Sequence, residues 1–73
     1  MQYLVIIEKR PESYGAYVPD LPGCIAAGET RDEVLRQIRQ AIETRLETLR
    51  NSNRPIPAPS STVEMIRVEA PAK

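Results

Sequence analysis

Apolar side chains follow two different periods along the chain, and the change of period separates a sheet-forming part from a helical part. Residues 3–9 are rich in β-branched and aromatic side chains, which favours a strand. Both alternating faces of this run are apolar, whereas a strand on a sheet with one solvated face has polar residues at every second position. We therefore expect residues 3–9 to form a central strand that is covered on both faces.

Two further short strands are predicted before the helical part. Residues 10–13 form a turn, because proline presets φ and serine favours turns. Residues 14–18 then pair back on the first strand as a hairpin. Gly15 within this run indicates either a β-bulge or the close approach of another group. Residues 24–28 are predicted to form a third strand, whose small side chains favour close packing by a neighbouring element.

A rigid corner is predicted between the second and third strands. The run from Pro19 to Gly23 holds two prolines and one glycine, which exclude both a helix and a central strand. We interpret it as an architectural element that sets where the third strand and the helix begin. The residues assigned to this corner are Pro19, Asp20, Pro22, Gly23 and Cys24.

One long amphipathic helix is predicted from Thr30 to about Arg50. Thr30 and Glu33 have the spacing of a capping box, in which the Thr30 hydroxyl accepts from the Glu33 amide and the Glu33 carboxylate reaches back. Arg45 falls inside the apolar arc of the helix, where it either extends out along its aliphatic stem or pairs with a carboxylate across an interface. The arc itself contains Val34, Leu35, Ile38, Ala41, Ile42, Leu46 and Leu49.

A proline-rich connector at 54–61 leads to a fourth predicted strand, Thr62 to Val68. The order β-β-β-α-β predicts an α+β fold in a single domain of residues 1–73, with a small, mostly antiparallel sheet and one long helix on one face. Because one helix covers only one face of a sheet, we expect the other apolar face to be a subunit or partner interface.

Composition narrows the possible functions. Ten basic residues balance ten acidic ones among 73, so the basic excess of a nonspecific nucleic-acid binder is missing. With one cysteine and no histidine, we expect neither an internal disulfide nor a zinc site, and no cofactor. So short a chain is marginally stable alone, which favours oligomerisation. We expect a cytoplasmic protein, because the sequence shows neither a membrane span nor a signal peptide.

Candidate catalytic groups are sparse. A nucleophilic cysteine or serine usually requires a histidine as base, and Cys24 is better interpreted as a small packing residue beside the corner. A two-metal nuclease needs several carboxylates that converge on one point. Alternation does not place Glu8, Asp20, Glu64 and Glu69 on one common face. We therefore predict no catalytic residue and no enzymatic activity, with a vestigial nuclease as the second alternative.

The charged side of the helix is the predicted partner-binding surface, although its mixed charges are also typical of a solvated helix face. Tyrosines on the first two strands can stack on RNA bases, or they can belong to the core or an interface. An RNA-binding module is therefore the first alternative. The predicted partner-binding residues are Arg36, Arg39, Glu43 and Glu47, and the tyrosines are Tyr3, Tyr14 and Tyr17.

Four segments together resemble the HicB-type antitoxin family, over nearly the whole chain. They are Tyr17-Val18-Pro19-Asp20-Leu21-Pro22-Gly23-Cys24, Gly28-Glu29-Thr30 with Glu33, Ala41-Ile42, and Ile56-Pro57-Ala58-Pro59. The resemblance implies a partial ribonuclease-H-like fold without nuclease activity, assembled as a homodimer or homotetramer. It also implies a partner, a small basic mRNA-cleaving toxin of the HicA type, which the antitoxin masks. Fuller members carry a C-terminal DNA-binding segment where this chain has a short strand and tail after Pro59, so we do not expect direct DNA binding.

Overall fold

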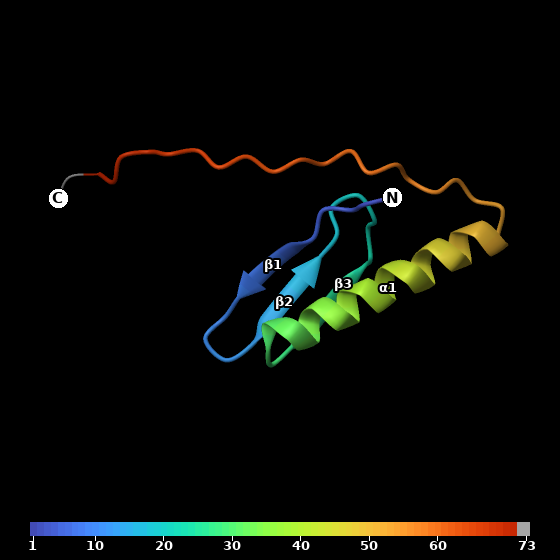
Figure 1. Cartoon of the computed structure of the whole chain (residues 1–73), viewed down its shortest axis with the longest axis horizontal. Coiled ribbons are helices and arrows are strands. Elements are labelled where there is room, and N and C mark those ends of the chain that lie inside the picture. The colour runs from blue at the N-terminus through green and yellow to red at the C-terminus, as the bar shows by residue number, and fades with distance from the viewer. Residues whose placement is uncertain (72–73) are drawn as a thin grey trace.

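The computed structural model describes residues 1–71 and has two layers (Figure 1). The elements are β1 (Ile6–Lys9), β2 (Tyr14–Tyr17), β3 (Ile25–Gly28) and α1 (Arg31–Asn51). The three strands form one antiparallel sheet in the order β1-β2-β3, and α1 packs against β2 and β3 on one face of it. The predicted α+β fold and its β-β-β-α order are thereby confirmed. Residues 72–73 of the predicted domain lie outside the described part.

β1 lies at an edge of the sheet, so the prediction of a central first strand is wrong. The middle position belongs to β2, and β1 begins at Ile6 rather than at Tyr3. Ile7 pairs with Ala16 on the face that packs against α1, and Ile6 pairs with Tyr17 on the opposite face. β1 therefore has apolar side chains on both faces for two different reasons. One face packs against the core below the helix, and the other face is open; the strand is not covered on both sides.

The corner between β2 and β3 consists of two consecutive turns. The Leu21 amide donates to the Val18 carbonyl at 3.1 Å, and the Cys24 amide donates to the Leu21 carbonyl at 3.1 Å. A bond from the Val18 amide to the Cys24 carbonyl, at 3.2 Å, closes the corner. Gly23 follows Pro22 with φ of +93°, as the third position of a type II turn requires. Leu21 is only 1% exposed, so the corner is also anchored in the core.

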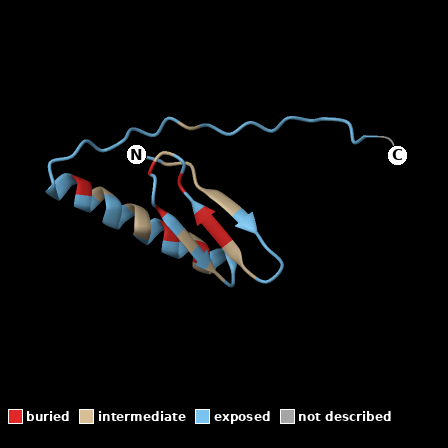
Figure 2. Ribbon diagram, turned by 180° about the vertical axis from the view of Figure 1, so that it is seen from behind, coloured by how far each residue is buried: buried red, intermediate tan, exposed pale blue. Residues whose placement is uncertain are grey.

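α1 begins at a side-chain cap and supplies two of the six residues of the core cluster. The Glu33 amide donates to the Thr30 hydroxyl at 3.1 Å. The Glu33 carboxylate accepts from the Gln37 side chain at 3.2 Å, instead of reaching back to Thr30 as the capping box predicts. Figure 2 shows the buried positions gathered between the sheet and the facing side of the helix. The core cluster comprises Ala16, Val18, Leu21, Cys24, Val34 and Ile38.

The segment after α1 is extended and does not enter the sheet. It returns across the end of the sheet where β1 begins, and then continues beyond the body of the domain (Figure 1). The predicted fourth strand at Thr62–Val68 is wrong for this structure, since 62–68 pairs with no strand. The composition favours a strand, but a strand forms only where a neighbouring edge satisfies its backbone groups. Within residues 1–71, no helix is long and apolar enough to cross a membrane.

Candidate interaction surfaces

The face of the sheet that points away from α1 carries a continuous apolar row. Ile6 lies opposite Tyr17, and Tyr17 lies opposite Ile25, so the three side chains cross the sheet side by side. Tyr17 is 40% exposed and Ile25 is 72% exposed. We call this row, with its immediate surroundings, the outer sheet face. It corresponds to the apolar face of the sheet that the single helix was not expected to cover.

A charged pair borders the apolar row. Arg10 approaches Glu8 to 3.4 Å, and both side chains are half exposed, so the pair adds little to stability. The Arg10 guanidinium lies within 2.7 Å of the place where a Cβ on Gly15 would stand. Because Gly15 pairs in regular register with Glu8 and Ala27, the glycine serves this close approach and not a bulge. The outer sheet face therefore combines an apolar centre with a polar border.

The helix residues predicted to bind a partner all lie on the solvent side of α1. They are Arg36, Arg39, Glu43 and Glu47, and each is exposed. In residues 1–71 the Arg10–Glu8 pair is the only ion pair, so no salt bridge fixes these four charges. The structure thus gathers the four side chains on one surface, separated from the outer sheet face by the thickness of the domain. Their contact with a partner stays a prediction.

A hollow of about 510 Å³ lies between the corner and the second half of α1, and Cys24 and Arg45 contribute to it. The Cys24 side chain is buried, and its thiol faces the Ala41 carbonyl at 3.8 Å. Burial raises the pKa of the Cys24 thiol, and the charge of Arg45 opposes that effect only in part. A protonated, buried thiol is a packing group and a poor nucleophile. Arg45 itself is exposed, so within one chain it extends to solvent.

The three tyrosines do not form a common platform for bases. Tyr3 and Tyr14 pack against the core, and the Tyr3 hydroxyl donates to the Pro57 carbonyl in the connector. Tyr17 lies on the opposite face of the sheet. Among residues 1–71, acidic and sulfur-bearing side chains nowhere gather into a group of three or more that could hold a metal ion.

Asp20 makes a contact that the sequence did not indicate. Its carboxylate accepts four hydrogen bonds, from the amides of Ser60 and Ser61, each at 2.9 Å, and from their hydroxyls at 3.2 and 2.7 Å. These bonds, the one from the Ser61 amide above all, lower the pKa of Asp20 from 3.8 to about 2. We call this contact the Asp20 clamp. Two adjacent serines after a proline-rich stretch are its only sequence signal, and nothing in that pattern names Asp20 as the acceptor.

Together, these observations define a small α+β domain with an exposed apolar row on the sheet face that points away from the helix. Residues 3–71 match the model of the HicB-like antitoxin of bacterial toxin–antitoxin systems, and the chain belongs to this family. It is 43% identical over 58 residues to the UPF0150 protein Ta0767 of Thermoplasma acidophilum, covering 78% of this chain and 84% of that one. It is 33% identical over 72 residues to Antitoxin HicB 2 of Photorhabdus laumondii, where it spans 99% of its own length but about half, 51%, of the relative.

Two solved structures share the fold. The N-terminal domain of the Burkholderia pseudomallei antitoxin HicB superposes with a TM-score of 0.71 at 34% identity, covering 80% of this chain and 69% of that one. A chain of the HicA3 and HicB3 toxin–antitoxin complex superposes with a TM-score of 0.67 at 32% identity, covering 82% of this chain and 70% of that one. The resemblance noted from the corner, the capped helix and the proline-rich connector is thereby confirmed.

Proposed function

We propose that this chain is a cytoplasmic, non-catalytic antitoxin that binds a HicA-type ribonuclease and masks the surface with which the toxin engages mRNA. Membership in the HicB-like antitoxin family supports the role. The similarity to a chain from the HicA3 and HicB3 complex supports a toxin of the HicA type as the partner. Masking is a steric effect, so the antitoxin needs a complementary surface and no catalytic group of its own.

The outer sheet face is the contact surface that the geometry favours. The centres of protein interfaces are apolar and aromatic, and charges there are concentrated at the rim. Tyr17 and Ile25 provide such a centre, and the Arg10–Glu8 pair provides a rim beside it. The exposed apolar row next to a charged border is the observation that carries this assignment. The solvent side of α1 is polar and rich in charge, so it is the second candidate surface.

A masking assay separates the two surfaces. A HicA-type ribonuclease from the same organism is purified, and its cleavage of RNA is titrated with this chain. We expect Ile25→Asp to weaken masking at least tenfold, because it places a charge at the centre of the contact, and Tyr17→Ala to weaken it in the same direction. The matched control reverses two charges on α1, Arg36→Glu with Glu43→Lys, and leaves masking unchanged. Circular dichroism verifies that every variant is folded.

Two outcomes would contradict the proposal. If the α1 charge reversal abolishes masking while Ile25→Asp leaves it intact, the contact lies on the helix and not on the sheet. If the wild-type chain fails to reduce RNA cleavage at any concentration, the antitoxin role itself is wrong.

We also propose that the chain acts as a homodimer or homotetramer. So small a domain is only marginally stable alone, which favours association with further copies.

A further inference from the structure

A second groove lies between residues 1–5, which lead into β1, and the first half of α1. Its volume is about 410 Å³. One wall consists of side chains from the start of the chain, and the other wall comes from the helix. The lining residues are Met1, Tyr3, Val5, Leu35, Ile38, Arg39 and Ile42. All of them except Arg39 are apolar or aromatic, so the groove is an apolar one with a single cation at its border.

The groove lies where a further strand, paired with the open edge of β1, would place its side chains. The side of β1 that faces away from β2 pairs with no strand, so its backbone groups form an open edge. A strand added at that edge would lie about 4.8 Å from β1 and direct every second side chain toward α1. Those side chains would enter the groove and cover Leu35 and Ile42, which the three-stranded sheet leaves only half buried.

The chain contains a segment with the composition of such a strand and without a place in the sheet. Thr62–Val68 is extended and exposed throughout, and Met65 is 91% exposed. Val63 and Met65 fall on one face of an extended segment, and Ile66 and Val68 fall on the other, so either face brings two apolar side chains. Four large apolar residues within six positions are unfavourable in a solvated tail, and such exposed apolar groups mark an interaction site.

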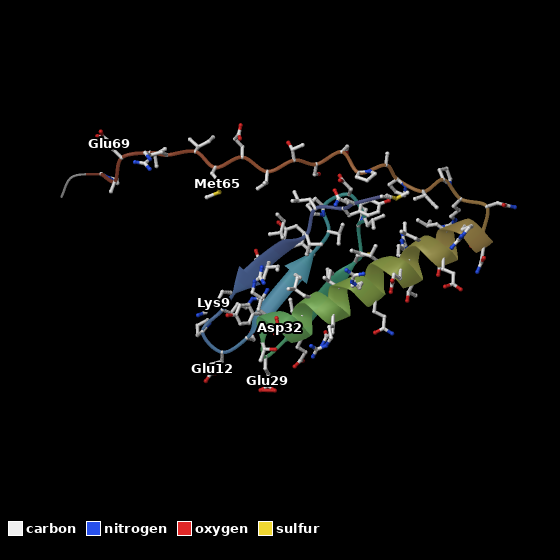
Figure 3. All side chains as sticks on the ribbon, viewed as in Figure 1. Lys9, Glu12, Glu29, Asp32, Met65 and Glu69 are labelled. Atoms are coloured by element: carbon white, nitrogen blue, oxygen red, sulfur yellow. The ribbon has the colours of Figure 1, made fainter. Side chains whose placement is uncertain are left out.

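The Asp20 clamp directs this segment away from its own sheet edge. Ser60 and Ser61 are held at the corner, and from there the chain runs outward from the body. Figure 3 shows Met65 and Glu69 along this outgoing segment, away from Lys9 at the end of β1. We propose that Thr62–Val68 of one copy adds to the sheet of a second copy beside β1, continues along residues 1–5 and fills the groove between those residues and α1. Reciprocal exchange closes a twofold symmetric dimer.

The backbone of the segment offers the first test. We expect the full chain to have twice the mass of one 8.2 kDa chain in light scattering after gel filtration. In an added strand only alternate amides point at β1, so one of Met65→Pro and Ile66→Pro should weaken the dimer at least tenfold and the other much less. Ala70→Pro, beyond the segment, is the matched control and keeps the dimer. A monomeric wild-type chain, or a dimer that tolerates both prolines, would overturn the proposal.

A complementation experiment establishes that the strand comes from another copy. The groove is blocked by Leu35→Glu in one full-length chain, and the segment is broken by the more damaging proline in another. Each chain alone should be monomeric, with a helix and sheet content like that of the wild type by circular dichroism. Mixed, they should form a heterodimer in which the intact segment of the first occupies the intact groove of the second. Failure of the mixture to associate means that the segment pairs within its own chain, which rejects the exchange. No toxin takes part, so the result is independent of the proposed masking of a toxin.

Discussion

The corner at residues 18–24 and the segment at 62–68 are both seven residues long and lie outside the strands and the helix, yet only the corner is fixed by its own sequence. In the corner, three backbone hydrogen bonds, two prolines and the buried Leu21 act within seven residues. The segment at 62–68 has strand-forming side chains and no partner in its own chain. Turn-forming residues thus determine the local structure by themselves, whereas strand-forming residues also require the free edge of a neighbouring strand.

This difference explains why the two regions should respond differently to mutation. A change in the corner removes contacts that are already made inside one chain, so it should lower the free energy of unfolding. A change in the segment leaves the isolated chain almost as stable as before and should alter association instead. The three predictions below test that contrast, beginning with the largest expected effect.

Leu21→Ala should cause the largest loss of stability. Leu21 is 1% exposed, and truncation of so buried a leucine costs about 2–5 kcal/mol through lost burial and the cavity left behind. Urea unfolding followed by circular dichroism measures the loss. Val63→Ala, in the exposed segment, is the control and should change the stability of the monomeric chain by less than about 0.5 kcal/mol. Equal losses for the two variants would show that the corner is not anchored as described.

Gly23→Val should cost about 1–3 kcal/mol, because a β-branched residue is strained at a φ of +93°. No atom lies within 4 Å of the place where a Cβ would stand, so the cost arises from the backbone and not from a clash. Gly23→Asn is the matched control, since asparagine tolerates positive φ, and it should retain most of the stability. The thermal midpoint of each variant measures the effect. An unchanged midpoint for Gly23→Val would refute the turn assignment.

The smallest effect concerns the Asp20 clamp, which holds Ser60 and Ser61 at the corner directly before the segment at 62–68. The pKa of Asp20 is lowered to about 2 from 3.8, so the clamp is complete above about pH 4 and is lost as the pH falls through about 2. Asp20→Asn should weaken it at neutral pH as well. Protection of the Ser60 and Ser61 amides from hydrogen exchange, measured against an unstructured chain at the same pH, should fall in both cases while the core amides stay protected. Glu69→Gln, which removes a charge outside the clamp, should leave that exchange unchanged.

Much of the fold follows from short-range patterns in the sequence. Thr30 caps the helix, Gly23 requires a turn, and the apolar arc of α1 includes Val34 and Ile38 in the core. Each of these depends on residues close together in the chain. The position of β1 was predicted wrongly because apolar residues on both faces occur in a central strand and also in an edge strand with an open face. Sequence periodicity does not distinguish the two.

The interaction surfaces were predictable only in part. The sequence indicated that one apolar face would be left open, but not that Ile6, Tyr17 and Ile25 would stand in one row, since register depends on where the hairpin turns. The Asp20 clamp joins residues 40 positions apart, and such a pairing has no local signal. The role of the solvent side of α1 stays a prediction, because exposure alone does not identify a contact.

The Asp20 clamp closes a long loop that encloses β3, α1 and the connector, and this has a kinetic consequence. Because the clamp joins distant parts of the chain, it forms only after the helix has docked on the sheet and brought the connector back to the corner. Its opening requires no unfolding of those elements. The segment beyond it can therefore be released and recaptured while the domain stays folded, so partners could exchange at a rate set by four surface hydrogen bonds rather than by global unfolding.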